Sequence, residues 1–240
     1  MFGGMKEFYQ QVQQDAHAQQ ININNRVYTT KDIQGVLEPE PDCITVTTLT
    51  GLVDFLKTNV DKLDVPSLLC HIESPTKVTL RSPLKGAFIQ RFAYIQAKAD
   101  LPEMHFDQYL DGEDFNVWLQ SSFVDGEDAA GNQKGLVLRY SSNVKQTVES
   151  GASDDGVTQV VSARVGIASV ENVVLPNPVS LRPYRTFTEV EQPSSSFIFR
   201  AKTGPRFALM EADGGAWRSK AMKNIKAFME SEVKDLHVIA

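Results

Sequence analysis

The stretch from residue 179 to residue 217 constrains the fold more than any other part of the chain. It reads VSLRPYRTFTEVEQPSSSFIFRAKTGPRFALMEADGGAW. Its apolar and β-branched residues predict strands over residues 179–190, 197–202 and 207–211. The segments between these strands are rich in Pro, Ser and Gly, which suit sharp reversals of the chain. Three consecutive strands joined by turns favour an antiparallel meander.

A helix is expected directly after this meander, over residues 216–236. Asp213 precedes it near the N-cap position, where a carboxylate can accept backbone N–H groups. The apolar positions have helical spacing and are expected to pack on the sheet; they are Met222, Ile225, Phe228, Met229, Val233 and Leu236. Residues 237–240 form either a short edge strand or a frayed end.

The remaining pattern predicts an α+β fold: a largely antiparallel β-sheet with three main helices, the last at the C-terminus. The first two helices are expected over residues 50–63, with Thr50 as the cap, and 111–123. Residues 136–148 are ambiguous between helix and strand. Further strands are expected over residues 44–48, 67–73, 77–82, 88–97, 157–167 and 169–175, with hairpins joining 67–73 to 77–82 and 157–167 to 169–175.

The N-terminal segment is interpreted as an arm, residues 1–24, preceding a single α+β domain, residues 25–240. The arm is rich in Gln and carries five apolar residues on roughly one helical face: Phe2, Met5, Phe8, Tyr9 and Val12. Such a face predicts an oligomerisation segment that is covered by a neighbouring copy. The alternative is a partly ordered tail, because termini are poorly ordered unless they dock.

Composition narrows the classes of protein that fit. A chain of 240 residues with 42% hydrophobic and 22% charged residues can build a core. Cys43 and Cys70 lack CxxC spacing, so neither a disulfide framework nor a zinc knuckle is predicted. No signal-peptide pattern and no long apolar run occurs in the sequence. We therefore expect a cytoplasmic protein without a membrane span.

Charge is distributed unevenly along the chain. Residues 182–226 hold nine Lys and Arg against four Asp and Glu, in a chain of net charge −6. Cations interleaved with aromatic rings are typical of surfaces that bind single-stranded nucleic acid. They are equally typical of a sheet with one buried and one solvated face, which is the favoured interpretation. The candidate residues for nucleic acid or an acidic partner are Arg182, Tyr184, Arg185, Arg200, Lys202, Arg206, Lys220 and Lys223.

Motifs of catalysis are missing from the sequence, which contains no GxSxG, GxxxxGK[ST], HExxH or GxGxxG. An acidic region containing His105, Asp107, Asp111, Glu113, Asp114 and a second DGED at residues 125–128 suggests a metal-dependent hydrolase as a third hypothesis. The ligand spacing of a calcium loop is missing there, and acids beside Gly are common in turns and helix starts. No catalytic residue, metal or cofactor is assigned.

Several stretches resemble proteins of unknown function carried by bacteriophages and prophages. They are VTTLTGLVDFL at 46–56, FIQRFAYIQA at 88–97, DDGVTQ at 154–159, RPYRTFTEVEQP at 182–193 and EADGGAW at 211–217. The first stretch also distantly resembles the YfdQ-like group. This resemblance implies expression from a mobile element in the cytoplasm of a host bacterium. We predict a non-enzymatic protein that forms a homo-oligomer or binds a host or phage protein, with single-stranded nucleic-acid binding as the alternative.

Overall fold

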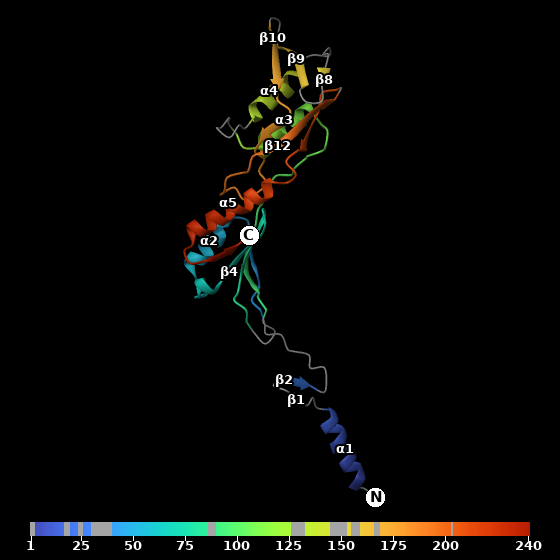
Figure 1. Ribbon diagram of the computed structural model, residues 1–240, viewed down its shortest axis with the longest axis vertical. Coiled ribbons are helices and arrows are strands. Elements are labelled where there is room, and N and C mark those ends of the chain that lie inside the picture. Colours follow the sequence, from blue (N-terminus) through green and yellow to red (C-terminus); the bar gives the residue numbers. More distant parts are fainter. Residues whose placement is uncertain are drawn as a thin grey trace. The chain divides into compact units, whose positions relative to one another are not determined.

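A computed structural model describes most of the chain, namely residues 3–16, 20–23, 26–29, 40–85, 90–125, 133–144, 153–154, 159–165, 169–202 and 204–240. The chain divides into two units, Met1–Glu40 and Pro41–Ala240. The first unit contains helix α1, Gly3–Ala16, and a two-stranded antiparallel hairpin of β1, Gln20–Ile23, and β2, Arg26–Thr29 (Figure 1). The predicted arm, residues 1–24, lies within this unit.

A five-stranded sheet forms one part of the second unit. Its strand order is β14-β4-β5-β6-β3, with bounds His237–Ile239, Leu69–Ser74, Lys77–Arg81, Ala93–Lys98 and Ile44–Val46. The three central strands are antiparallel, and both edge strands run parallel to their neighbours. Of the two alternatives for the C-terminal residues, a short edge strand or a frayed end, the structure shows the edge strand.

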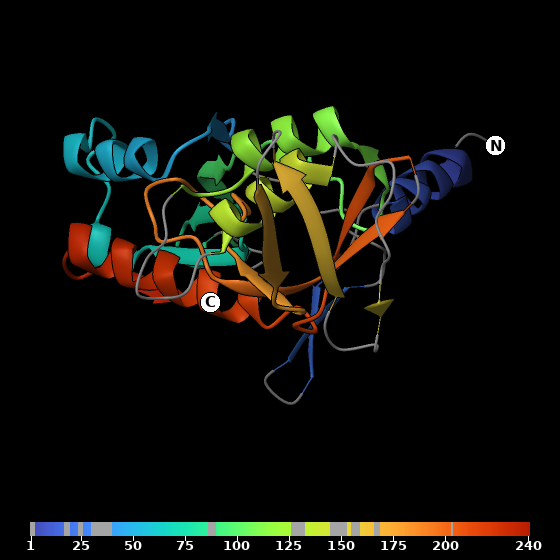
Figure 2. The same ribbon diagram turned by 90° about the horizontal axis from the view of Figure 1, so that it is seen from above.

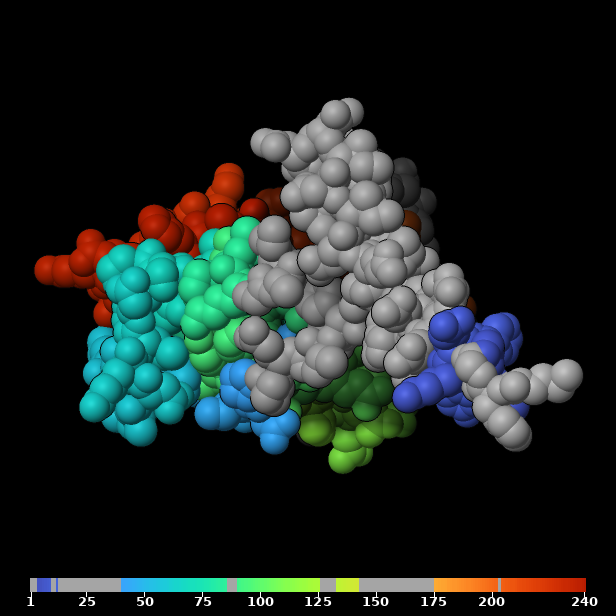
Figure 3. All heavy atoms as spheres, turned by 90° about the horizontal axis from the view of Figure 1, so that it is seen from below, coloured from blue at the N-terminus to red at the C-terminus, as the bar shows by residue number. Residues whose placement is uncertain are grey.

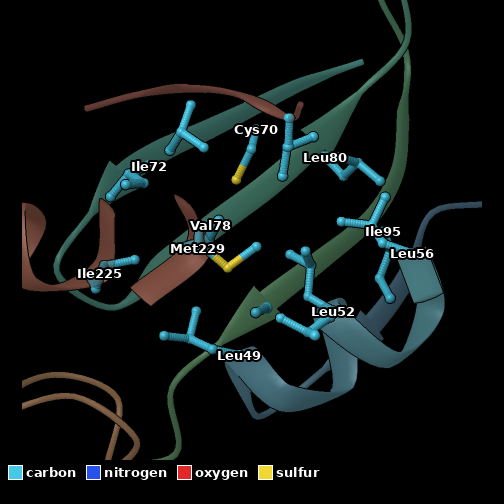
Figure 4. Close-up of a cluster of buried hydrophobic side chains, with 14 of the residues drawn as sticks. Leu49, Leu52, Leu56, Cys70, Ile72, Val78, Leu80, Ile95, Ile225 and Met229 are labelled. Atoms are coloured by element: carbon cyan, nitrogen blue, oxygen red, sulfur yellow. The ribbon is translucent and has the colours of Figure 1, made fainter. Parts of the chain in front are cut away.

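Two helices cover one face of this sheet: α2, Leu49–Thr58, and α5, Trp217–Glu232. A 3-10 turn, Val65–Ser67, leads from α2 into β4. Figure 4 shows side chains of α2 and α5 packed against those of the strands. The labelled members of this first core cluster are Leu49, Leu52, Leu56, Cys70, Ile72, Val78, Leu80, Ile95, Ile225 and Met229. In Figure 3 the red C-terminal segment lies against the cyan and green segments of α2 and this sheet.

A four-stranded sheet forms the second part of this unit. Its order is β11-β12-β13-β7, with bounds Val179–Leu181, Ser195–Lys202, Arg206–Glu211 and Leu110–Asp111. Helices α3, Gly112–Ser122, and α4, Lys134–Val144, lie with it in a second core cluster. That cluster is dominated by rings: Phe115, Trp118, Phe123, Tyr140, Phe197, Phe199 and Phe207. A third sheet of β8, Ser153–Asp154, β9, Gln159–Val165, and β10, Ser169–Leu175, contacts α4.

The stretch from 179 to 217 contributes to both clusters. Strands β11, β12 and β13 supply the second cluster, whereas Phe187 and Val190, in the loop between β11 and β12, are buried in the first. Helix α5 leaves β13 and packs on the first sheet beside α2, as Figures 1 and 2 show. This stretch is therefore the structural link between the two halves of the second unit.

The predicted fold class is confirmed, including a last helix that packs on a sheet. The expected strand over residues 179–190 is wrong beyond Leu181. Pro183 has no N–H for a ladder, and the side chain of Gln192 supplies the bonds instead. It accepts from the N–H groups of Arg185 and Thr186, and it donates to the carbonyls of Thr186, Phe187 and Val190.

Helix α2 is shorter than expected at its end and is capped by a different residue. It stops at Thr58 because Asn59 adopts left-handed backbone angles, φ 43° and ψ 49°, and its N–H bonds to the carbonyl of Phe55. The hydroxyl of Thr48, not the predicted Thr50, accepts the N–H of Gly51 at 3.0 Å. The segment left ambiguous, residues 136–148, contains most of α4.

Candidate functional site

Arg185 is a cationic residue buried inside the second unit: only 5% of it is exposed, and Lys134 is the other buried cation among the described residues. Its Nη1 donates to the carboxylate of Glu211 and its Nη2 to the hydroxyl of Ser195. Its Cζ lies 4.0 Å from the centre of the Trp217 ring and 5.6 Å from that of Phe197. Cation–π contacts of this kind are strongest where water is excluded. We call this group of residues the arginine centre.

Electrostatics in the arginine centre are balanced by two acids. Burial lowers the pKa of Arg185 to about 10, although the charges of Glu211 and Asp213 oppose this shift. The pKa of Asp213 is raised by burial, but the Ser195 hydroxyl, the Gly215 N–H and the charge of Arg185 outweigh that and lower it. Arg185 and Asp213 are therefore ionised at neutral pH, and the ion pair of Arg185 with Glu211 holds the centre together.

A small pocket of about 260 Å³ lies beside the arginine centre. It is lined by Ser180, Ser194, Ser195, Ser196, Asp213, Ala216, Trp217 and Lys220. Strands β11 and β12, the turn after β13 and the first turns of α5 thus converge on one polar cavity. The hydroxyls of Ser180 and Ser194 lie 2.7 Å apart and share a hydrogen bond. We call this cavity the serine pocket.

The eight residues predicted to bind nucleic acid or an acidic partner, all within residues 182–226, lie in several different places in the structure. Arg185 and Lys220 lie at the arginine centre and the serine pocket. Arg182 donates its Nε to the carbonyl of Gln192 at 3.1 Å, and Lys202 and Arg206 both contact Tyr109. Tyr184 and Arg200 are half-buried, and Lys223 is exposed on α5. The structure therefore does not gather these residues into one group.

The aromatic residues of the same region are mostly internal. Phe187 lies in the first core cluster, and Phe197, Phe199 and Phe207 lie in the second, each no more than 1% exposed. Bases stack on exposed ring faces. These four rings are closed to a nucleic acid, so the arrangement matches a sheet with one buried face more closely than a base-stacking platform.

The acidic region has local structural roles. Asp111 caps α3, since its Oδ1 accepts the N–H groups of Glu113 and Asp114 at 3.0 Å. The ring of His105 packs edge-on to Trp118 with centroids 5.9 Å apart. Glu127 and Asp128 of the second DGED lie outside the described residues. Among the residues that are described, no three His, Cys, Asp or Glu side chains are grouped to hold a metal ion.

The first unit presents a different kind of surface. Helix α1 exposes four large apolar side chains at positions i, i+3, i+4 and i+7: Met5 at 62%, Phe8 at 67%, Tyr9 at 69% and Val12 at 49%. Phe2, the fifth residue predicted for this face, lies outside the described residues. We call the four described residues the α1 stripe.

Sequence reasoning missed most of the arginine centre. Local patterns place Glu211 in a strand, Ser195 in a turn and Trp217 in a helix. They do not reveal the shared partner, Arg185, which lies 10 to 32 positions earlier in the chain. The run of three serines at 194–196 beside the ADGG turn was the available signal. Lys220 was a further signal, because a cation in the early turns of a helix is electrostatically unfavourable without an acidic partner.

Comparison with family models, with curated proteins and with solved structures finds no match to this chain. In the described part of the chain, no helix combines the length and the apolarity needed to cross a bilayer.

Proposed function

We propose that this protein is a non-enzymatic assembly protein of bacteriophage or prophage type, which associates with further copies of itself through helix α1. The observation that carries the proposal is the α1 stripe. Four large apolar side chains are 49–69% exposed on two successive turns of one helix. Contiguous apolar surface of this kind, unlike single exposed residues, marks interaction sites.

The spacing of the stripe fits a partner that is itself a helix. Positions i, i+3, i+4 and i+7 form the seam by which amphipathic helices pair. Helix α1 has 14 residues and is rich in Gln. An isolated helix of this length is marginal in water, so its helicity should depend on packing.

A second copy of α1 is the partner that matches this helix in charge. The helix carries one Lys, one Glu and one Asp, so two copies meet with little repulsion. An identical stripe also satisfies the symmetry of a dimer, in which the same patch is used on both sides. From the areas that aromatic side chains bury, the exposed parts of the stripe offer roughly 450 Å² per copy. Stable pairs bury about 800 Å² per partner, so we expect weak, concentration-dependent association.

The resemblance to prophage proteins supplies the proposed setting, the cytoplasm of a host bacterium. Binding of a different host or phage protein by the same stripe is the competing outcome. The test below separates it from self-association, because a stripe that needs a different partner leaves the pure protein monomeric.

The experiment compares two double variants of the full chain by sedimentation velocity. Phe8→Ala with Tyr9→Ala removes the centre of the stripe, whereas Lys6→Ala with Glu7→Ala changes exposed polar residues of the same turn. Both pairs keep helix propensity high because Ala is the best helix former. We expect the stripe variant to be monomeric at concentrations where wild type and control associate. Equal association of all three proteins would remove α1 from the interface.

A further inference from the structure

The serine pocket combines a cavity with donor groups that the described protein leaves free. Lys220 lines it, is exposed, and has no carboxylate within ion-pair distance among the described residues. The hydroxyl of Ser196 likewise makes no hydrogen bond within the described chain. In the Ser180–Ser194 pair, one hydroxyl donates to the other, which leaves the second free to donate outward.

Helix α5 adds a positive terminus to the same cavity. Within residues 204–240, no side chain caps its start and its first turn holds no acidic residue. The first N–H groups of a helix and its dipole attract anions. Instead of an acid, the beginning of this 16-residue helix carries two cations, Arg218 and Lys220. The guanidinium Cζ of Arg218 lies 5.0 Å from the Trp217 ring centre.

Two buried donors without an acceptor belong to residues in or next to the pocket lining. The Nε of Arg185 and the Nε1 of Trp217 are both buried and find no acceptor within the described residues. Arg185 is 5% exposed and touches the pocket lining through its bond to Ser195 and its contact with Trp217. Buried donors without acceptors are uncommon in proteins and call for an explanation.

Asp213 is the one carboxylate among the described lining residues, and its side chain is already bonded within the protein. Its Oδ1 accepts the Gly215 N–H at 2.9 Å, its side chain bonds to Ser195, and the charge of Arg185 lies close to it. Glu211 is paired with the same guanidinium group. Around the cavity, the three cations Arg185, Arg218 and Lys220 face the two carboxylates Glu211 and Asp213, which leaves one positive charge in excess.

We propose that the serine pocket is an oxyanion site that binds a phosphate group, held by Lys220, the serine hydroxyls and the N-terminus of α5. A phosphate group offers several acceptor oxygens to donors that converge from two strands and a helix start. A water molecule takes about 30 Å³ of the liquid, so a pocket of about 260 Å³ admits the group with room for what it is attached to. This site is independent of self-association through α1.

Titration calorimetry with inorganic phosphate, at low ionic strength, tests the site. The informative variant is Lys220→Gln, and the matched control is Lys223→Gln, an exposed lysine three residues further along α5 that does not line the pocket. Loss of one charge-assisted bond should weaken binding about tenfold, or about 1.4 kcal/mol. The control should stay within about twofold, and Ser196→Ala should weaken binding without changing the net charge.

Three results would overturn the proposal. The first is the absence of saturable binding by wild type. The second is that Lys223→Gln weakens binding as much as Lys220→Gln does, which would indicate diffuse electrostatic attraction. The third is that acetate binds as tightly as phosphate, which would exclude selection of the tetrahedral group. The change in Trp217 fluorescence on binding gives the location. That change should disappear in Trp217→Phe, and its persistence would place the ligand elsewhere.

Discussion

Replacing Arg185 by Met should destabilise the second unit strongly, although the sequence pattern around Arg185 is typical of a solvent-exposed face. Methionine keeps much of the side-chain volume and removes the charge and the five donors. Glu211 then loses its ion-pair partner, Ser195 loses a donor, and Trp217 loses the guanidinium group on its face. The effect is therefore electrostatic more than steric.

The magnitude follows from the burial of the two partners. Removing one member of a buried ion pair costs about 3–5 kcal/mol. The carboxylate of Glu211 is 30% exposed, so water compensates part of that cost. The lost contact with Trp217 adds on the order of 1 kcal/mol. We expect Arg185→Met to lower the free energy of unfolding by about 2–4 kcal/mol, a large share of the 5–15 kcal/mol typical of a domain.

Urea denaturation followed by tryptophan fluorescence measures this loss. Arg206→Met is the matched control, because Arg206 is exposed and makes one long bond to the Tyr109 carbonyl, at 3.4 Å. It should change the free energy of unfolding by less than about 0.5 kcal/mol. Adding Glu211→Gln to Arg185→Met should cost less than the sum of the single changes, because the carboxylate is then no longer unpaired. Arg185→Met within about 0.5 kcal/mol of wild type would refute the reasoning.

Two further substitutions test what stabilises the five-stranded sheet. Burial raises the pKa of Glu73, but bonds from Lys77, Thr79 and Arg81 outweigh this and lower it to about 2. Glu73→Gln should therefore cost about 1–2 kcal/mol at neutral pH after screening. Because the folded pKa is depressed, this difference should shrink as the pH falls from about 5 to about 2; a constant difference by urea denaturation would contradict it. Met229→Ala should cost about 3 kcal/mol by the same assay, since Met229 is 0% exposed. A cost below about 1 kcal/mol would argue against its burial between α5 and the five-stranded sheet.

Local patterns made much of the fold predictable. The strands β12 and β13, the hairpin of β4 and β5 and the helix α5 follow from period-two and period-3.6 patterns within short windows. The loop of residues 182–194 does not follow from such patterns. Its conformation depends on five hydrogen bonds made by one buried side chain, that of Gln192. The end of α2 was also hidden, since Asn59 in a left-handed conformation interrupts an apolar pattern that continues to Leu63.

The two candidate surfaces differ in how far the sequence reveals them. The α1 stripe could be read directly, because helical spacing alone places its residues on one face. The arginine centre could not be predicted in this way, because a run of charged residues in a sequence does not show how deeply each side chain is buried. Whether Arg185 lies in water or in the interior depends on Glu211 and Trp217, which the meander and α5 bring to it from later in the chain.

Sedimentation equilibrium of the wild-type full chain over a wide range of concentrations tests self-association most directly. We predict an average mass that begins at that of the monomer and rises with concentration, because the α1 stripe offers less area than a permanent interface needs. A mass that stays at the monomer value throughout the range would contradict the proposal that this chain assembles with copies of itself.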